Sequence, residues 1–240
     1  MIRFYAPEIT TRMTLPESES AHAVRVLRKK AGDEIEVVDG VGFLYRCRLI
    51  TEHHKSAVVE IMERIPLPKV WTPNIRLAVA PTKHIDRMEW LVEKAVEIGV
   101  DEFIPVLTER SERRQINTER LEKIAVSAMK QSLKAVMPVI HEMTPLKAYL
   151  GAVAPGSQRF VGWCDAVSER RLLACACQPA MDTDILIGPE GDFTPEEIDI
   201  CRKAGFIAVT MGDNRLRTET AALVGLDTVH IVNQAFGKNV

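Results

Sequence analysis

Two glycine-containing segments near the C-terminus carry the residues best suited to chemistry. The first reads Ile187-Gly-Pro-Glu-Gly-Asp-Phe193, and the second reads Met211-Gly-Asp-Asn-Arg-Leu-Arg-Thr-Glu-Thr-Ala221. Glycine lets the backbone approach a ligand closely, and proline stiffens a turn. Both segments follow apolar runs typical of strands, and in open α/β sheets ligands bind where strands end. Either segment alone would be interpreted as a tight turn that only folds the chain.

The elements that position these loops alternate between strand and helix after Asn74, which predicts an α/β domain with a parallel sheet over residues 74–240. Apolar residues recur at helical spacing from Met88 to Val96, with Gly99 as the expected C-cap. Thr194 is an expected N-cap, because proline and glutamate follow at the positions that favour a helix start. The expected strands are 75–79, 103–107, 159–163, 184–187 and 206–210, and the other expected helices are 118–136, 166–177 and one from Arg217.

The N-terminal part has a different pattern. Short strands are expected at 34–38, 43–50 and 56–65, with an Asp-Gly turn at Asp39, and they predict a small β-barrel over residues 1–70. Pro66, Pro68 and Pro73 then remove backbone donors and disfavour helix, so we expect the domain boundary there.

The pairing of Gly188-Pro-Glu-Gly191 with Leu216-Arg-Thr-Glu-Thr-Ala221 resembles the signature of the RsmE family, which comprises uridine-N3 methyltransferases of 16S ribosomal RNA. His22-x-x-Arg25-Val-Leu-Arg28 and Thr108-Glu-Arg-Ser111 are also similar to that family. The resemblance implies a PUA-like RNA-binding barrel and a SPOUT α/β domain with a parallel sheet and a trefoil knot. It also implies a homodimer with its active sites at the interface, S-adenosyl-L-methionine as cofactor, and 16S ribosomal RNA of the small subunit as partner.

The site residues expected from these motifs fall into three groups. The expected cofactor-binding residues lie in the two glycine loops and are Leu186, Ile187, Gly188, Pro189, Glu190, Gly191, Met211, Gly212, Leu216, Arg217, Thr218, Thr220 and Ala221. The expected RNA-binding residues are the basic side chains Arg25, Arg28, Lys29, Lys30, Lys83, Arg87, Arg110, Arg113 and Arg114. These basic clusters give local positive patches on a chain whose net charge is −2.

The third group is catalytic. Uridine N3 is protonated at neutral pH, so methyl transfer needs its proton removed or the developing anion stabilised. Arg217 is the candidate for stabilising that charge or for holding the cofactor carboxylate, and Glu219 is the candidate base. The alternative is that these side chains cap the final helix and pair locally, and it applies to Glu219 more than to Arg217. His22 and His84 are the other possible bases, although a lone histidine beside basic residues is more often a surface residue.

Three departures from the family pattern bear on these assignments. Asp192 replaces the usual second glycine and places an extra carboxylate beside the expected methionine pocket. Asn214 stands where the family has arginine, with the basic side chain displaced to Arg215. Lys134 replaces a forked arginine with a point charge. We expect altered contacts rather than a changed function.

Several other function classes are disfavoured. The sequence has no membrane-length apolar run and no secretory signal, so we expect a cytoplasmic protein. Five cysteines without a CxxC pair indicate neither disulfides nor a metal site. A Rossmann dehydrogenase would need GxGxxG after the first strand of its domain, and the segment after Ala80 has none. A methyltransferase acting on another RNA nucleotide and a non-catalytic RNA-binding assembly factor remain as alternatives.

Overall fold

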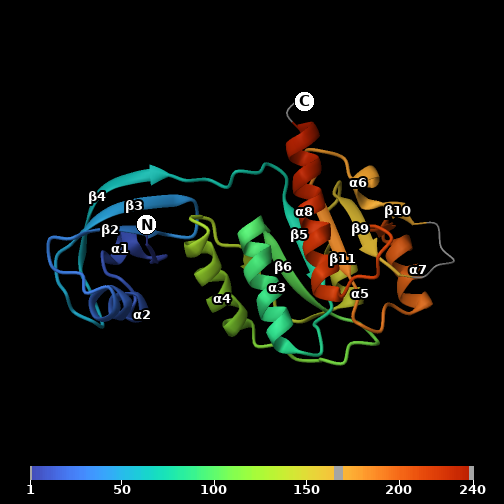
Figure 1. Ribbon diagram of the computed structural model, residues 1–240, viewed down its shortest axis with the longest axis horizontal. Coiled ribbons are helices and arrows are strands. Elements are labelled where there is room, and N and C mark those ends of the chain that lie inside the picture. The colour runs from blue at the N-terminus through green and yellow to red at the C-terminus, as the bar shows by residue number, and fades with distance from the viewer. Residues whose placement is uncertain (1, 165–169, 238–240) are drawn as a thin grey trace. The chain divides into compact units, whose positions relative to one another are not determined.

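The computed structural model describes residues 2–164 and 170–237 of the chain (Figure 1). The chain divides into two compact units, of which the first comprises Met1–Val70 and Val126–Met137 and the second comprises Trp71–Ala125 and Pro138–Val240. The segment Val126–Met137 lies, in sequence, within the range expected for the second domain. Because its partners are far away in sequence, no local pattern indicated where it would pack.

The first unit is built on a sheet with strand order β1-β2-β3-β4, in which β1 and β2 are parallel and the other pairs antiparallel. The expected strands are present. Buried residues of the sheet, among them Phe4, Ile35 and Tyr45, form the core of this unit. The strands are β1 Arg3–Tyr5, β2 Glu34–Val38, β3 Phe43–Leu49 and β4 Val59–Pro66, and the helical segments are α1 Ile9–Arg12, α2 Glu17–Ala21 and a π-helical turn at His22–Val26.

The second unit contains a parallel sheet with strand order β10-β12-β9-β11-β5-β6-β7, and β8 pairs with β6. Every strand pairing described in this sheet is parallel, as the alternating pattern predicted. The strands are β5 Ile75–Val79, β6 Glu102–Leu107, β7 Val139–Ile140, β8 Thr144–Pro145, β9 Gln158–Gly162, β10 Arg171–Leu172, β11 Thr183–Ile187 and β12 Ile207–Thr210. The helices are α3 Ile85–Ile98, α4 Thr118–Gln131, α5 Leu146–Ala152, α6 Leu173–Ala176, α7 Pro195–Lys203 and α8 Thr218–Phe236.

Helices cover both faces of this sheet. Alternate residues of a strand point to opposite faces, so a single strand contributes to both of the cores that the helices cover. Leu186 of β11 belongs to a core cluster with residues of α5 and α7. Its neighbour Ile185 lies against α8, at 3.4 Å from the position of a Cβ on Gly225. Helix α3 packs beside α8 (Figure 1).

Local sequence signals account for the helix boundaries. The predicted apolar stripe of α3, from Met88 to Val96, is buried, and Gly99 follows the helix at a φ of 129°, which favours glycine. Helix α7 begins with the predicted capping box, in which Thr194 and Glu197 bond to each other's backbone N–H groups. Helix α8 begins at Thr218, with Arg217 as its N-cap.

Two expected helices differ from the structure. Helix α4 ends at Gln131 rather than Val136, and Leu133 then has a φ of 57°. The residues beyond it bond across the first unit, where the N–H of Gly42 donates to the carbonyl of Ala135. The expected helix at 166–177 falls partly outside the described residues. Its remainder forms the short strand β10, paired with β12, and the short helix α6, so the helix prediction is wrong at Arg171–Leu172 and correct at Leu173–Ala176.

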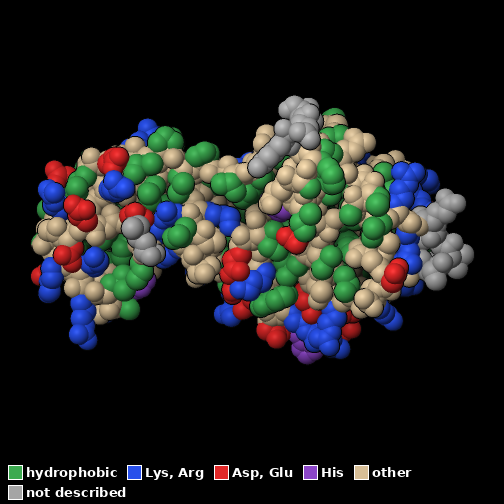
Figure 2. All heavy atoms as spheres, turned by 45° about the horizontal axis from the view of Figure 1, so that its top comes forward, with side chains coloured by type: hydrophobic (Ala, Val, Ile, Leu, Met, Phe, Trp, Pro, Cys, Tyr) green, Lys and Arg blue, Asp and Glu red, His purple; other side chains and the backbone are tan. Residues whose placement is uncertain are grey.

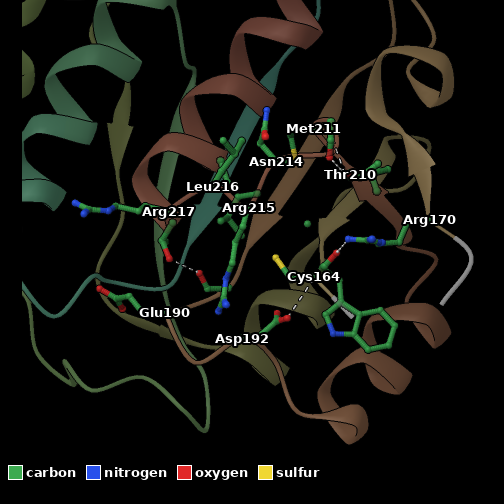
Figure 3. A pocket seen from close by; sticks show the side chains of 18 of the residues that line it. Cys164, Arg170, Glu190, Asp192, Thr210, Met211, Asn214, Arg215, Leu216 and Arg217 are labelled. Carbon is green, nitrogen blue, oxygen red and sulfur yellow. Dashed lines mark hydrogen bonds between the residues drawn. The ribbon is translucent and has the colours of Figure 1, made fainter. Parts of the chain in front are cut away.

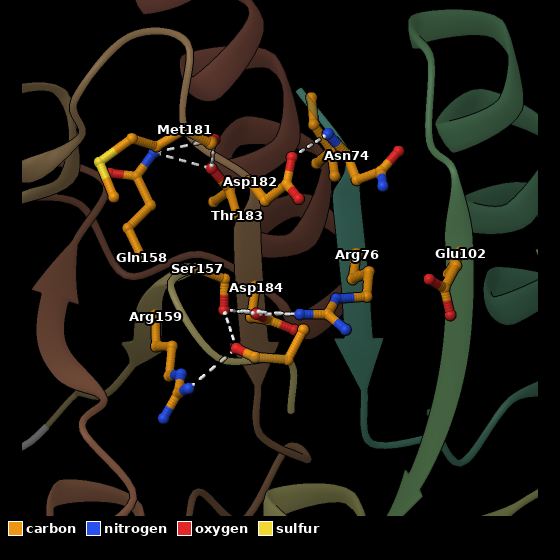
Figure 4. A network of polar contacts seen from close by, with 12 residues as sticks. Asn74, Arg76, Glu102, Ser157, Gln158, Arg159, Met181, Asp182, Thr183 and Asp184 are labelled. Carbon is orange, nitrogen blue, oxygen red and sulfur yellow. Dashed lines mark hydrogen bonds and ion pairs between the residues drawn. The ribbon is translucent and has the colours of Figure 1, made fainter. Parts of the chain in front are cut away.

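A buried polar network lies near the amino ends of β5, β9 and β11 (Figure 4). The carboxylate of Asp184 is fully buried, and its Oδ2 accepts from Arg76 Nη2 at 2.6 Å and from the Ser157 hydroxyl at 2.6 Å. Its Oδ1 accepts from the Tyr149 hydroxyl at 3.4 Å. A buried charge is tolerated only when it is paired and hydrogen-bonded, and this network meets both requirements.

Candidate functional site

A large hollow in the second unit lies at the carboxyl edge of the parallel sheet (Figure 3). Its volume is about 830 Å³, within the usual range for a small-molecule site. Three strands end at it, since Gly162 of β9, Ile187 of β11 and Thr210 of β12 line the walls. The first turn of α8 contributes Thr218 and Ala221. Both glycine loops therefore meet at one pocket, as their shared position after strands indicated.

Most of the expected cofactor-binding residues line this pocket, and they are Ile187, Gly188, Pro189, Glu190, Met211, Gly212, Leu216, Arg217, Thr218 and Ala221. Three do not. Leu186 is fully buried in the core, Gly191 lies against the side chain of Arg110, and Thr220 does not line the pocket. Successive residues of strand β11 point to opposite faces of the sheet, and successive residues of helix α8 point in different directions around its axis. A contiguous sequence motif therefore includes residues that do not line the pocket.

The conformations of the two glycine loops are fixed by hydrogen bonds and by close packing. The Thr218 hydroxyl donates to the carbonyl of Gly188 at 3.1 Å and so ties the start of α8 to the first loop. A Cβ on Gly188 would lie 2.8 Å from the ring of Phe193, which is buried, so only glycine fits there without a shift. In the second loop Gly212 has a φ of 130°, and Thr210 Oγ1 donates to its carbonyl at 2.6 Å.

Sequence reasoning missed one wall of the pocket. Trp163, Cys164 and Arg170 line it from the segment that follows β9. Asp192 Oδ2 accepts from the N–H of Cys164 at 3.2 Å, and Arg170 donates to the carbonyl of Trp163 at 3.0 Å (Figure 3). The expected strand at 159–163 was the available signal, because parallel strands end at a common edge.

Charges of both signs surround the pocket. Arg170, Arg215 and Arg217 line it together with Glu190 and Asp192. Burial, followed by the negative charge of Asp192, raises the pKa of the Cys164 thiol above its ordinary value. Cys164 is therefore protonated at neutral pH and is a poor nucleophile.

The structure separates the two catalytic candidates. Arg217 is exposed and lines the pocket, whereas Glu219 is only 6% exposed and does not line it. The nearest cation described for Glu219 is Arg87 of α3, whose Nε lies 3.8 Å from its Oε1. Of the histidines, His22 packs against the ring of Phe4 in the first unit, and His84 is the N-cap residue of α3.

The basic residues of the second unit occupy different environments. Lys83, Arg113 and Arg114 line a second, shallower hollow together with Glu112 and Gln115. Arg113 donates to the carbonyls of Thr82 and Lys83, and Arg110 donates to that of Gly191. These two guanidinium groups are thus bonded within the protein.

In the first unit, Arg25, Arg28 and Lys30 are exposed, and Lys29 is half-buried. Lys30 pairs with Glu52 at 3.4 Å, and Lys29 donates to the carbonyl of Glu34. Figure 2 shows Lys and Arg side chains interspersed with Asp and Glu on the visible face. Among the described residues, there is no group of three or more His, Cys, Asp or Glu able to hold a metal, and no helix is long and apolar enough to cross a membrane.

Family models match both parts of the chain. An RNA methyltransferase domain matches residues 71–230, and an RNA methyltransferase PUA domain matches residues 15–62. Among solved structures, a probable rRNA-methyltransferase from Porphyromonas gingivalis has a TM-score of 0.94 and 43% identity over 98% of this chain and 100% of that one. A ribosomal RNA small subunit methyltransferase E from Neisseria gonorrhoeae, bound to S-adenosyl methionine, has a TM-score of 0.86 and 28% identity over 97% and 98%.

Curated relatives agree with the structural neighbours. The ribosomal RNA small subunit methyltransferase E of Synechocystis sp. is 30% identical over 94% of this chain and 75% of its own length, and that of Aquifex aeolicus is 27% identical over 92% and 95%. These matches confirm the expected fold class, an N-terminal PUA-like part followed by a SPOUT α/β part with a parallel sheet; the trefoil knot stays a prediction. The chain therefore belongs to the RNA methyltransferase family that includes the ribosomal RNA small subunit methyltransferases E.

Proposed function

We propose that this protein transfers the methyl group of S-adenosyl-L-methionine to N3 of a uridine in 16S ribosomal RNA. The observation that carries the proposal is the pocket at the carboxyl edge of the sheet, in a chain that belongs to an RNA methyltransferase family. Two solved relatives, from Neisseria gonorrhoeae and Legionella pneumophila, are described with S-adenosyl methionine bound. Since the small ribosomal subunit is cytoplasmic, we assign the protein to that compartment.

The residues of the pocket fit this cofactor in two respects. Glycine loops bring backbone donors and acceptors close, and a Cβ at Gly188 or Gly162 would meet neighbouring side chains at 2.8 and 2.9 Å. The methionine part of the cofactor carries both a carboxylate and an ammonium group. Arg215 is suited to the carboxylate, and Glu190 and Asp192 to the ammonium.

The bound cofactor supplies an electrophilic methyl group on a sulfonium. The N3 proton passes to solvent, and the protein must hold the deprotonated N3 in line with that methyl group and lower the cost of the negative charge on the base. Arg217 is placed to do the second, because it is exposed at the pocket. Glu219 is buried away from the lining, so as a base it would need another conformation, and we propose Arg217 as the main electrostatic contributor.

A methylation assay tests this function. Purified protein, S-adenosyl-L-methionine and either free 16S RNA or small subunits are incubated, and the RNA is analysed by nucleoside mass spectrometry and by reverse transcription. An N3 methyl group blocks the base-pairing edge of uridine, so reverse transcriptase should stop at one position. A stop with a different methylated nucleoside would support the same-fold alternative. Cofactor binding without any methylation of either RNA would contradict the proposal, and RNA binding without cofactor binding would favour an assembly factor.

We propose that RNA binds through the exposed cations Arg25, Arg28 and Lys30 of the first unit, together with Lys29, Lys83, Arg87 and Arg114. If about four of them contact phosphates of single-stranded RNA, the log–log salt slope should be about −3. We consider the replacement of the four basic residues of this cluster, Arg25, Arg28, Lys29 and Lys30, by glutamine. The replacement should flatten the salt slope by about one to two units and leave cofactor affinity unchanged. An unaltered slope with full activity would show that the cluster is only a solvated surface.

We further propose that the protein acts as a homodimer, since symmetry can bring one subunit's RNA-binding unit to the other's pocket. Light scattering at micromolar concentration should give twice the chain mass of 26.9 kDa. A monomer that retains full activity would contradict the dimer.

A further inference from the structure

Three loops at the carboxyl edge of the sheet are tied together by two arginines. The loops follow β5, β6 and β11, three strands that lie side by side in the sheet order. The loop after β6 supplies both arginines, Arg110 and Arg113, and it forms no wall of the larger pocket. The loop after β11 contains Gly188, Pro189 and Glu190, which line the pocket of the proposed cofactor, followed by Gly191.

Arg110 is bonded to the backbone of the loop after β11. Its Nη1 donates to the carbonyl of Gly191 at 2.9 Å and of Phe193 at 3.4 Å. Its aliphatic stem lies directly over Gly191, because a Cβ added there would be 3.4 Å from Arg110 Cβ and 3.6 Å from its Cδ. The side chain thus covers the outer side of the loop, while Gly188 and Glu190 line the pocket on the inner side.

Arg113 is bonded to the loop after β5, which in turn holds the glycine loop. Arg113 Nε donates to the carbonyl of Thr82 at 3.2 Å, and its Nη2 donates to that of Lys83 at 2.8 Å. The N–H of Lys83 then donates to Glu190 Oε1 at 3.0 Å. The two guanidinium groups therefore hold the glycine loop from two directions, at Glu190 and at Gly191.

We infer that Arg110 and Arg113 are positioning residues for the cofactor loop Gly188–Gly191 rather than phosphate contacts, an inference that rests on the proposed cofactor site. Both arginines direct donors at backbone carbonyls, and the atoms so used, Nη1 of Arg110 and Nε and Nη2 of Arg113, fix each side chain against the protein instead of against a phosphate. Holding a loop in its binding conformation removes part of the ordering cost of binding. Arg114 of the same loop differs, because no hydrogen bond or ion pair to another described residue holds its side chain, which lines the shallow hollow.

The test compares Arg110→Met, Arg113→Met and the matched control Arg114→Met. Methionine keeps an unbranched apolar stem and removes the donors. Titration calorimetry with S-adenosyl-L-methionine should show roughly tenfold weaker binding in the first two variants, because each loses charge-assisted bonds to carbonyls. Their RNA salt slopes should equal that of the wild type. Arg114→Met should bind the cofactor normally and reduce the salt slope by about 0.7.

Steady-state kinetics distinguishes positioning from a general structural defect. The KM for the cofactor should rise in Arg110→Met and Arg113→Met, and kcat at saturating cofactor should stay within about twofold, because neither arginine touches a reacting atom. A partly unfolded variant would instead lose kcat in proportion to its inactive fraction.

The outcomes separate the inference from the function on which it rests. Wild-type protein that fails to bind the cofactor would overturn both. Wild-type binding with undiminished cofactor affinity in Arg110→Met and Arg113→Met, together with flatter salt slopes, would overturn the inference alone and return both residues to the RNA-contact group.

Discussion

The two edges of one parallel sheet do different work in this protein. At the amino edge, Arg76, Asp184 and Ser157 form a buried network whose polar groups are bonded to one another (Figure 4). At the carboxyl edge, glycine loops leave a pocket of about 830 Å³ lined by charges of both signs (Figure 3). The difference follows from the parallel topology. Each strand of such a sheet is followed by a loop and a helix N-terminus at its carboxyl end, so backbone donors point to a ligand at that edge and not at the other. The comparison predicts that the amino edge controls stability and the carboxyl edge controls binding.

The largest effect should come from Asp184→Ala at the amino edge. The change leaves Arg76 largely buried without its carboxylate and removes the shorter of the two bonds of the Ser157 hydroxyl, so stability should fall by about 3–5 kcal/mol. Urea unfolding measures this loss, and cofactor affinity of the folded protein should be unchanged. Asp182→Ala is the control, because the only bond described for the Asp182 side chain is one accepted from the exposed backbone N–H of Asn74. Equal losses of stability in the two variants would show that the buried network contributes no more to stability than an exposed hydrogen bond.

The second effect should come from Gly188→Ala at the carboxyl edge. The new Cβ would lie 2.8 Å from the ring of the buried Phe193, and the ring or the loop must shift. We expect at least about tenfold weaker cofactor binding and a stability loss of about 1–3 kcal/mol. Gly151→Ala is the control, since a Cβ on Gly151 meets nothing within 4 Å. Undiminished cofactor affinity in Gly188→Ala would show that the loop does not form the site.

A smaller effect at the same edge should follow Thr218→Val, which removes the hydroxyl that bonds to the Gly188 carbonyl and keeps the shape of the side chain. Loss of one neutral hydrogen bond costs about 1 kcal/mol, which corresponds to roughly fivefold weaker cofactor binding. Thr228→Val in the same helix is the control, because its hydroxyl bonds to the carbonyl of Val224. If both variants bind the cofactor equally well, the link between α8 and the glycine loop is dispensable.

The smallest effect at neutral pH should come from Tyr149→Phe. Its bond to Asp184 is long, at 3.4 Å, so the loss should be below about 1 kcal/mol. Burial, and then the charge of Asp184, raise the pKa of Tyr149 well above its ordinary value.

The sign of the pH effect follows from this raised pKa. The tyrosine of the unfolded chain ionises near pH 10, while that of the folded protein stays neutral. The stability that the raised pKa of Tyr149 implies is therefore fully present below about pH 10 and is lost as pH rises toward the folded pKa. Above pH 10 the wild type should lose stability relative to Tyr149→Phe, by at most about 1.4 kcal/mol per pH unit. Parallel stability curves for the two proteins between pH 9 and 11 would contradict the raised pKa.

What the sequence determined by itself is local or repetitive. The capping box at Thr194, the buried stripe from Met88 to Val96 and the strands that end before the two glycine loops follow from spacing of a few residues. The paired motifs around Gly188 and Leu216 also identified the family, and most of their residues line the pocket.

What only the tertiary structure decided involves partners distant in sequence. The wall formed by Trp163, Cys164 and Arg170 is joined to Asp192 through Cys164, across 28 positions, and Arg110 reaches Gly191 across 81. Glu219 faces inward because α8 packs against α3, which no motif specifies. Periodicity states which side of an element is buried, but not which element covers it. The docking of arginines on distant carbonyls is therefore fixed by packing of the whole sheet and its helices.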